Sequence, residues 1–483
     1  MKLKKLLKDI PVVECTADME LEIENVYYDS RKVTENSLFV AVSGFDSDGN
    51  RFIPMALSKG AAAVVTAKKP ETDVPYVLVE SDRLALALLG CNFFGHPARA
   101  MTMIGITGTN GKTSSTLLLK QVLEKTLGAK VGLIGTMANM VGDEVIPTER
   151  TTPESFELQS LFARMRDAGC THVVMEVSSH AVTLERLGGT HFDIAAFTNL
   201  TEDHLDFHKT MDAYCDAKAE LFRRCCRAVV NIDDGYSDRI LAAAACPVLT
   251  TSVTGEADLR AENLELLSEG ISFDALCGGE KAAVHLPIPG KFTVYNALTV
   301  IGIARQLGIP LADCAEALKT AEGVKGRVEV VPTPGTPYSV LIDYAHTPDG
   351  LENVLSSVKD FSRGRLISVF GCGGDRDPMK RPIMGRIGVQ LSDIAVITSD
   401  NPRTEEPMAI IEDILKGVKQ EYGEYIVIED RRAAIRYAMD LAKKDDIIVL
   451  VGKGHETYQD IGGHKYHLDE REEVAAHLEE LRK

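Results

Sequence analysis

A glycine-rich turn, Gly105–Thr113, constrains the fold of this chain more than any other segment. It reads Gly-Ile-Thr-Gly-Thr-Asn-Gly-Lys-Thr and lies between the apolar stretch Met101–Ile106 and a helical pattern of apolar residues at 117–123. In a strand–turn–helix unit, backbone N–H groups and the helix N-terminus converge on phosphate oxygens, while the Lys-Thr pair reaches the terminal phosphates and a bound Mg²⁺. The sequence therefore predicts a nucleotide-phosphate site made of Gly108, Thr109, Asn110, Gly111, Lys112 and Thr113.

This loop is a variant of the usual phosphate loop, because Ile106 stands where that pattern has a glycine. The alternative is an ordinary turn between a strand and a helix. We favour the phosphate site, since two glycines followed by Lys-Thr in this context rarely lack a ligand.

The composition narrows the class of protein. A chain of 483 residues is expected to form about two to four domains. Its formal net charge of −18 argues against a nucleic-acid-binding surface. No apolar run is long enough to span a membrane, the N-terminus lacks the apolar core of a secretory signal, and ten cysteines without a CxxC pair suit reduced thiols. We therefore expect a cytoplasmic enzyme that binds neither nucleic acid nor membranes, and we expect a monomer.

Three domains are predicted, at residues 1–98, 99–327 and 328–483. In the second and third, strand-like runs alternate with helical patterns, which favours mostly parallel sheets covered by helices on both faces. The expected class is α/β, with a central phosphate-loop domain and a C-terminal doubly wound, Rossmann-like domain. The polar stretch 247–288 is expected to add antiparallel strands. Expected strands are 26–31, 37–42 and 61–66; then 101–106, 173–177, 194–199 and 228–231; then 339–342, 366–370, 394–398, 425–428 and 447–451.

Polar residues follow two strands of the central domain. Glu176 closes the run 173–177, where a phosphate loop needs a Mg²⁺ ligand; the alternative is a helix cap or a surface carboxylate. His204 follows the next strand and could ligate a metal, although a lone histidine near acidic residues is more often structural. Lys218 lies in a plain amphipathic helical pattern, so the residues alone predict an exposed lysine.

Polar loops marked by glycine or proline follow four strands of the third domain. Such loops meet at one edge of a parallel sheet, where ligands bind; each alone could be a turn, but four together favour a binding crevice. Asn296, near a helix start, and Arg327, at the predicted domain junction, could contact a nucleotide; the alternatives are a helix-start turn and a surface ion pair. The four loops are 343–349, 371–377, 399–403 and 452–456.

Taken together, these motifs resemble the Mur ligase family. The resemblance runs from Asp29-Ser30 to the last loop and implies three domains that bind, in order, a uridine-nucleotide substrate, ATP and an incoming amino acid. It also implies ATP-dependent amide formation through an acyl phosphate, with Mg²⁺. The most specific motifs are Gly-Thr-Asn-Gly-Lys-Thr at 108–113, Glu-Val-Ser-Ser-His at 176–180, Asp-Tyr-Ala-His-Thr-Pro at 343–348 and Gly-Lys-Gly-His-Glu at 452–456.

The resemblance assigns roles to single residues. Lys218 matches a lysine that carries a carbamate, an anion that helps to hold Mg²⁺, and this reverses the expectation from composition. Leu184 stands where some relatives have a glutamine, close to the substrate residues. The implied catalytic residues are Lys112, Glu176, His204 and Lys218, and the implied Mg²⁺ ligands are Thr113, Glu176, His204 and carbamylated Lys218. Asn296, Arg327 and Asp343 join the loop in binding ATP, and Ser30, Thr151, Thr152, Ser178 and Arg186 match positions for the UDP-muramoyl-dipeptide.

The motif Asp400-Asn-Pro-Arg403 resembles that of ligases that add meso-diaminopimelate to UDP-N-acetylmuramoyl-L-alanyl-D-glutamate. A guanidinium can take the distal carboxylate of diaminopimelate through two hydrogen bonds, and lysine lacks that carboxylate. The alternatives are a lysine-adding branch or a folylpolyglutamate-synthase-like ligase and, in other classes, a phosphate-loop GTPase or kinase, or a nucleotide-binding regulator. The implied acceptor residues are Arg381, Asp400, Asn401, Pro402, Arg403, Gly452 and Glu456.

Overall fold

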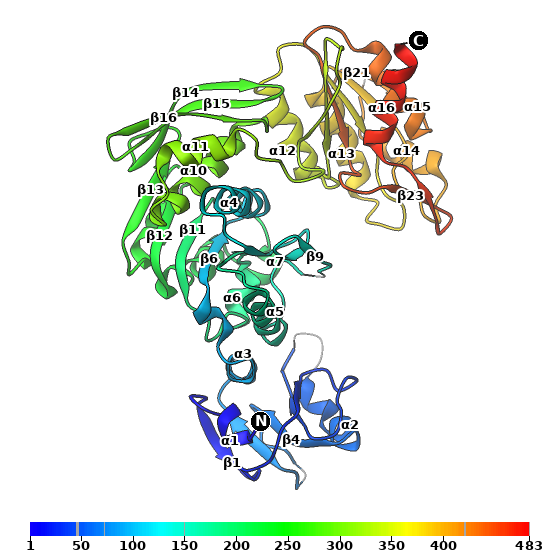
Figure 1. The fold of residues 1–483 in the computed structure, drawn as a ribbon. Coiled ribbons are helices and arrows are strands. Elements are labelled where there is room, and N and C mark those ends of the chain that lie inside the picture. Colours follow the sequence, from blue (N-terminus) through cyan, green and yellow to red (C-terminus); the bar gives the residue numbers. More distant parts are fainter. Residues whose placement is uncertain (45–47, 72, 149, 420–421, 483) are drawn as a thin grey trace. The chain divides into compact units, whose positions relative to one another are not determined.

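The computed structural model describes residues 1–44, 48–71, 73–148, 150–419 and 422–482 (Figure 1). The chain divides into two compact units, Met1–Asp258 with Thr299–Pro310, and Leu259–Leu298 with Leu311–Lys483. The predicted α/β class is confirmed, whereas the domain boundaries at 98/99 and 327/328 stay a prediction. Among the described residues, no helix is both long and apolar enough to cross a membrane.

A five-stranded sheet opens the first unit, in blue in Figure 1. Its strands pair in parallel except for the N-terminal one, which is antiparallel to its neighbour. Apolar side chains of this sheet and of the first and third helices form one buried core. The sheet order is β1 (Val12–Cys15), β5 (Tyr76–Val79), β4 (Ala61–Thr66), β3 (Ser37–Val40) and β2 (Asn25–Tyr27); the helices are α1 (Leu3–Leu6), η1 (Gly49–Phe52), α2 (Ile53–Ser58), α3 (Asp82–Phe93) and η2 (Pro97–Ala100).

The phosphate loop belongs to a second, mostly parallel sheet in the first unit. Its strand order there is β13 (Val248–Ser252), β12 (Cys225–Asn231), β11 (Phe192–Phe197), β6 (Thr102–Thr107), β10 (His172–Glu176), β7 (Val131–Ile134), β8 (Asn139–Val141) and β9 (Glu144–Ile146), and only the last two strands are antiparallel to their neighbours. The helices are α4 (Lys112–Leu127), α5 (Ser155–Asp167), α6 (Ser179–Thr183), α7 (Leu205–His208), α8 (Met211–Ala219), η3 (Phe222–Arg224) and α9 (Ser237–Ala243).

The register of this sheet brings the predicted catalytic segments to one edge. β6 lies between β10 and β11, with Glu176 paired to Ile106 and Phe197 paired to Thr107. The carboxyl ends of three neighbouring parallel strands therefore coincide at the phosphate loop. This is the edge at which parallel α/β sheets bind ligands.

The second unit begins with three antiparallel strands, as predicted for most of the stretch 247–288, whereas the start of that stretch forms the parallel strand β13. β14 (Leu259–Leu267) pairs with β15 (Gly270–Cys277), which pairs with β16 (Glu280–Leu286). Helix α11 (Leu311–Leu318) packs against β16. The boundary between the units falls within α10 (Lys291–Gln306).

A six-stranded sheet forms the rest of the second unit. Only its first strand is antiparallel, and the last strand of the chain to join inserts between two earlier ones. The order is β17 (Glu329–Val331), β18 (Ser339–Asp343), β22 (Ile447–Val451), β19 (Leu366–Phe370), β20 (Ile394–Ile397) and β21 (Glu424–Val427); a hairpin of β23 (Tyr458–Ile461) and β24 (His464–His467) follows β22.

Helices cover both faces of this sheet, so the predicted doubly wound arrangement is confirmed. Alternate strand residues face two separate cores, because successive side chains of a strand point to opposite faces. One core includes α12 (Pro348–Lys359), α13 (Lys380–Leu391) and α14 (Pro407–Leu415). The other includes α15 (Arg431–Leu441) and α16 (Glu470–Leu481).

Candidate functional site

The phosphate loop has the predicted strand–turn–helix form. β6 ends at Thr107 and α4 begins at Lys112. Gly108 and Gly111 have φ values of 152° and 83°, which L side chains rarely adopt. A Cβ built on Gly108 would lie 1.9 Å from the Thr198 hydroxyl oxygen, so only glycine fits there. The loop geometry is thus confirmed, and its ligand stays a prediction.

Two lysines point at one carbonyl of this loop. Lys112 Nζ donates to the carbonyl oxygens of Gly108 (2.9 Å) and Thr109 (2.7 Å), and Lys218 Nζ donates to that of Gly108 (2.8 Å). Burial lowers the pKa of Lys112 despite the nearby carboxylates of Glu176 and Asp203. The amine groups of the two lysines therefore meet at one point of the phosphate loop.

Lys218 is buried, so the expectation of an exposed lysine is wrong. Its side chain is 1% exposed, and its ammonium lies 4.5 Å from the ring centre of Tyr214. Burial and then the charge of Lys112 hold the pKa of Lys218 well below its usual value. The missed signal was spacing: Tyr214, Cys215, Lys218 and Ala219 share one helical face, and that face is buried.

Glu176 joins the end of β10 to the phosphate loop. Its carboxylate accepts hydrogen bonds from the Thr113 hydroxyl (3.1 Å) and from the Thr136 hydroxyl (3.0 Å) and backbone N–H (2.8 Å). The side chain is only 1% exposed. Mg²⁺ is commonly held by one or two carboxylates together with substrate phosphates, and this buried carboxylate beside a threonine hydroxyl suits such a site.

His204 lies in a strained position near the same edge. Its φ is 53°, its Nδ1 is 3.4 Å from an oxygen of Asp203, and its ring stands edge-on to that of His180 at 4.8 Å. Within the described ranges, no three His, Cys, Asp or Glu side chains are grouped so that they could hold a metal. The full ligand set of Thr113, Glu176, His204 and Lys218 therefore stays a prediction.

Four of the predicted dipeptide residues gather beyond β10. The Thr152 hydroxyl donates to the Glu176 carbonyl (2.8 Å) and accepts from the Ser178 N–H (3.2 Å), while Arg186 donates to the Thr152 carbonyl (3.0 Å). Thr151 and Thr136 share a hydroxyl contact of 3.0 Å. Ser30, by contrast, lies in the turn after β2 of the N-terminal sheet, and its buried hydroxyl faces the sulfur of Met55.

Sequence reasoning missed an arginine cluster around Glu154. Arg83, Arg150 and Arg186 approach its carboxylate at 3.7, 3.9 and 3.3 Å. These residues come from three separated segments, so no sequence motif marks them. A cavity of about 650 Å³ lies beside them, lined by residues of β2 and the turn after it, of the segment before α5 and of α5 itself, including Tyr28, Arg31, Arg150, Glu154 and Glu157.

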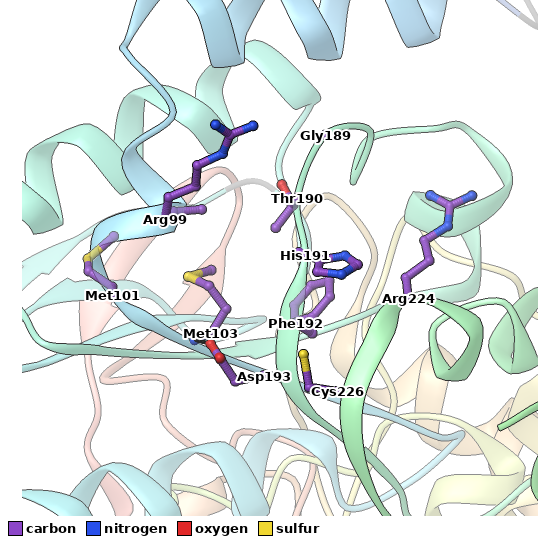
Figure 2. A pocket seen from close by; sticks show the side chains of 11 residues that line it. Arg99, Met101, Met103, Gly189, Thr190, His191, Phe192, Asp193, Arg224 and Cys226 are labelled. Carbon is purple, nitrogen blue, oxygen red and sulfur yellow. Dashed lines mark hydrogen bonds between the residues drawn. The ribbon is translucent and has the colours of Figure 1, made fainter. Parts of the chain in front are cut away.

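A second cavity, of about 640 Å³, lies at the opposite edge of the parallel sheet (Figure 2). Its walls come from the beginnings of β6, β11 and β12, and Arg99 and Arg224 stand on opposite sides of it. None of the predicted site residues lines it.

Of the three predicted nucleotide-binding residues of the second unit, Asn296 and Asp343 are buried and Arg327 is exposed. Asp343 accepts hydrogen bonds from the N–H groups of Val328 and Ala345, both at 2.8 Å, and burial raises its pKa. The Arg327 guanidinium lies 5.6 Å from the Tyr344 ring centre. Asn296 is buried within α10. Their part in binding a nucleotide stays a prediction.

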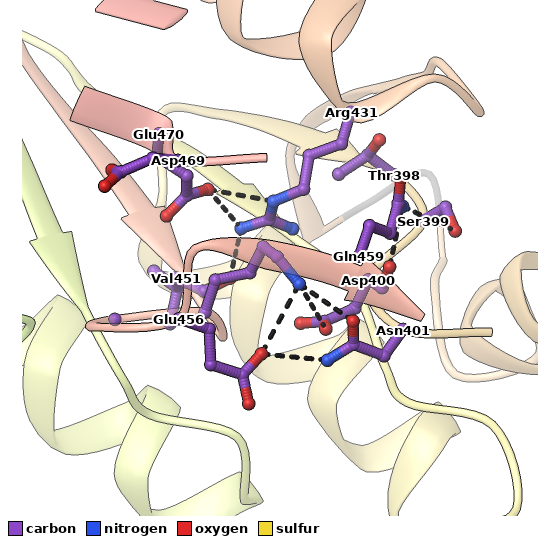
Figure 3. Close-up of polar contacts among 12 residues, drawn as sticks. Thr398, Ser399, Asp400, Asn401, Arg431, Val451, Glu456, Gln459, Asp469 and Glu470 are labelled. Carbon is purple, nitrogen blue, oxygen red and sulfur yellow. Dashed lines mark hydrogen bonds and ion pairs between the residues drawn. The ribbon is translucent and has the colours of Figure 1, made fainter. Parts of the chain in front are cut away.

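The predicted acceptor residues cluster at the ends of β20 and β22 (Figure 3). Asn401 Nδ2 donates to Glu456 Oε2 at 2.9 Å, which ties the loop after β20 to the loop after β22. Arg403 has a φ of 51°, and its side chain donates to the Gly374 carbonyl at 2.7 Å. Asp400, Asn401 and Pro402 are buried.

Arg381 is held by two carboxylates. Its guanidinium is 2.7 Å from Glu405 and 2.9 Å from Asp413, and the side chain is 3% exposed. These two ion pairs occupy much of its donor capacity in this conformation. Its predicted contact with an amino acid stays a prediction.

Gly452 is required by close packing. It has a φ of 119°, and a Cβ there would lie 2.4 Å from Asp400 Oδ2. Gly335 also has a positive φ, 89°, but nothing lies within 4 Å of a Cβ built on it.

We expect Gly452→Ala to destabilise the protein more than Gly335→Ala. Both substitutions carry the cost of a positive φ, about 1–2 kcal/mol. Only the first also displaces a buried carboxylate, which adds about 1–3 kcal/mol. The midpoints of urea unfolding at equal m values measure the difference, and equal midpoints for the two variants would contradict the close contact with Asp400.

Comparison with known proteins identifies the family of this chain. Residues 22–90 match the domain described as "Mur ligase family, catalytic domain", residues 106–304 the "Mur ligase middle domain", and residues 326–454 the "Mur ligase, glutamate ligase domain". The UDP-N-acetylmuramoyl-L-alanyl-D-glutamate–2,6-diaminopimelate ligase 1 of Clostridium acetobutylicum is 49% identical over 484 residues, covering 100% of both chains.

Two further comparisons extend over the whole chain. The corresponding ligase of Clostridium tetani is 48% identical over 488 residues, again covering 100% of both chains. A solved structure of a UDP-N-acetylmuramoyl-L-alanyl-D-glutamate–2,6-diaminopimelate ligase is 30% identical, has a TM-score of 0.79, and is matched over 100% of this chain and 99% of its own. With matches in all three family domains and relatives of nearly half identity end to end, this chain belongs to the Mur ligase family.

Proposed function

We propose that the protein is an ATP-dependent ligase that adds meso-diaminopimelate to the D-glutamate of UDP-N-acetylmuramoyl-L-alanyl-D-glutamate, as the names of its relatives state for them. It would serve peptidoglycan precursor synthesis in the cytoplasm. The observation that carries the proposal is the bond between Asn401 and Glu456. It links a loop bearing the Arg403 guanidinium to a loop bearing a carboxylate, and this pairing matches the carboxylate and ammonium of one amino-acid centre.

The phosphate loop supplies the other half of the chemistry. A carboxylate is a poor electrophile, so the γ-phosphoryl group of ATP is first transferred to the D-glutamate carboxylate. The amine then attacks the acyl carbon, phosphate leaves with the C–O electron pair, and the nitrogen loses a proton. Lys112 stabilises the charge on the transferring phosphoryl group. Bound Mg²⁺, held by Thr113 and Glu176 with His204 and carbamylated Lys218, would neutralise further phosphate charge.

Other residues bind the two large substrates. We assign Asn296, Arg327 and Asp343 of the second unit to ATP, together with the phosphate loop. Ser30, Thr151, Thr152, Ser178 and Arg186 would bind the UDP-muramoyl-dipeptide, and the cavity lined by Arg31 and Arg150 supplies cationic side chains for its diphosphate.

Product mass tests this function directly. The protein is incubated with ATP, Mg²⁺ and the UDP-dipeptide, and either diaminopimelate or lysine is offered. We expect the diaminopimelate tripeptide, ADP and phosphate. An ¹⁸O label in the glutamate carboxylate should pass to the released phosphate, as an acyl phosphate requires. ATP hydrolysis without a tripeptide, or preferential addition of lysine, would contradict the proposal.

Arg403→Ala should weaken the selection of diaminopimelate. The change removes the partner of the distal carboxylate, and a charge-assisted pair contributes about 1.5–3 kcal/mol, so kcat/KM for diaminopimelate should fall about tenfold to a hundredfold. Activity toward lysine should change far less, because lysine lacks that carboxylate. The ratio of kcat/KM for the two acceptors is the quantity to measure.

Arg386 provides a matched control, as an exposed arginine on α13 of the same unit. Arg386→Ala is expected to keep the wild-type ratio. If Arg403→Ala lowers both acceptors in proportion, Arg403 supports the fold or general catalysis and does not select the substrate.

A further inference from the structure

Lys453 lies at the centre of a buried polar cluster that its loop motif did not predict. We define the Lys453 cluster as Asp400, Asn401, Lys453 and Glu456 (Figure 3). The Lys453 side chain is 0% exposed. Its ammonium donates to Asn401 Oδ1 at 2.9 Å and lies 3.4 Å from Glu456 Oε2 and 3.6 Å from Asp400 Oδ1. A fully buried ammonium is costly unless it is paired, so these contacts account for its presence.

Lys453 fixes which way the Asn401 amide points. An ammonium only donates hydrogen bonds, so the oxygen of the amide must face it. The backbone N–H of Asp460 also donates to Asn401 Oδ1, at 2.9 Å. The NH₂ group is thereby directed to Glu456 Oε2, to which it donates at 2.9 Å.

This arrangement brings both contacts to one carboxylate oxygen of Glu456 and leaves the other oxygen open. Both the Asn401 amide and the Lys453 ammonium contact Oε2. Over the ranges that the structure describes, no hydrogen bond reaches Glu456 Oε1, and the side chain is 16% exposed. Glu456 Oε1 is therefore available to a cation.

The charges of the cluster leave room for one ammonium. Two carboxylates, Asp400 and Glu456, face one lysine, so the cluster carries one excess negative charge. The buried Arg431 does not cancel it, because its guanidinium is paired with Glu470 at 2.7 Å, both side chains being 0% exposed. Arg431 also donates to the Val451 carbonyl at 2.9 Å, which anchors the strand end that leads to Lys453.

We propose that Lys453 is a positioning residue for the acceptor amino acid: by holding Asn401 and Glu456 Oε2, it presents Glu456 Oε1 to the distal ammonium of diaminopimelate. This inference rests on the proposed function. Without Lys453, the carboxylates of Asp400 and Glu456 lose the cation that lies near both, and the Asn401 amide loses its fixed orientation. Glu456 then no longer offers a fixed negative charge at one place.

The test uses acceptor selectivity, measured with diaminopimelate and with 2-aminopimelate, which lacks the distal amine. The ratio of their kcat/KM values does not depend on the fraction of enzyme that is folded, so it remains readable even in a destabilised variant. In Lys453→Met we expect the wild-type preference for diaminopimelate to fall about tenfold, as for one lost charge-assisted contact. KM for ATP and for the UDP-dipeptide should stay near wild type.

Three further variants separate positioning from stability. Lys453→Arg keeps the charge and should restore part of the preference. Lys444→Met removes an exposed lysine of the same unit and should change nothing. Arg365→Met breaks the ion pair with Asp446 (2.6 Å) just before the starts of β19 and β22, at the opposite strand ends from Lys453, so it should lower the melting temperature with the preference kept. An unchanged preference in Lys453→Met overturns the inference. If the wild-type protein makes no diaminopimelate product, the proposed function itself fails, and that result precedes any variant.

Discussion

Lys112→Ala is expected to reduce turnover by about 10³-fold or more while the protein stays folded. Single preorganised charges at transferring phosphoryl groups and oxyanions contribute on this scale. Lys112 is the first residue of α4, and its ammonium spans the carbonyls of Gly108 and Thr109, so removal deletes a positive charge from the loop without opening the core. Tripeptide formation measured at saturating substrates gives kcat directly.

The control is a lysine near the other end of the same helix. Lys125 is exposed in the last turn of α4, and Lys125→Ala should keep turnover near wild type. Lys112→Ala with turnover within about threefold of wild type would remove the phosphate-loop assignment, since charge stabilisation of phosphoryl transfer predicts far more.

Local sequence patterns predicted the positions of the strands but not their order in the sheets. The predicted runs 366–370 and 447–451 coincide with β19 and β22, because apolar runs bounded by polar turns mark buried strands. The same runs do not reveal that β22 inserts between β18 and β19. Neighbours in a sheet are chosen by packing between distant segments, which a local pattern does not contain.

Sequence reasoning failed mainly to predict which charged residues are buried and which charges pair. Lys453 lies between two glycines and reads as a loop residue, yet it is fully buried because Asp400 and Asn401 reach it from another strand end. Glu154 likewise collects arginines from segments far apart in the chain. Motifs located the edges of the sheets correctly, whereas the pairing of charges across those edges needed the structure.

Lys218→Ala should be nearly inactive and still folded. Burial holds the pKa of Lys218 well below its usual value, so near neutral pH a larger share of its amine is uncharged than in an exposed lysine. Only the neutral amine attacks CO₂; a C–N bond forms, a proton is lost, and an anionic carbamate remains. The amine lies on the same Gly108 carbonyl as Lys112, so that anion would stand beside the phosphate loop. Lys218→Ala removes the amine and therefore the carbamate.

Three measurements connect this loss to the carbamate. Lys218→Met keeps the side-chain bulk against Tyr214, so it should be as inactive as Lys218→Ala if the amine is what matters. Formate or acetate should restore part of the activity of Lys218→Ala, because a small carboxylate can occupy the space of the missing anion. The wild-type enzyme should lose activity when dissolved CO₂ is removed and regain it with bicarbonate. Full activity of Lys218→Ala without added carboxylate would refute the carbamate, and inactivity without either rescue or CO₂ dependence would leave Lys218 acting as a buried amine that holds the phosphate loop.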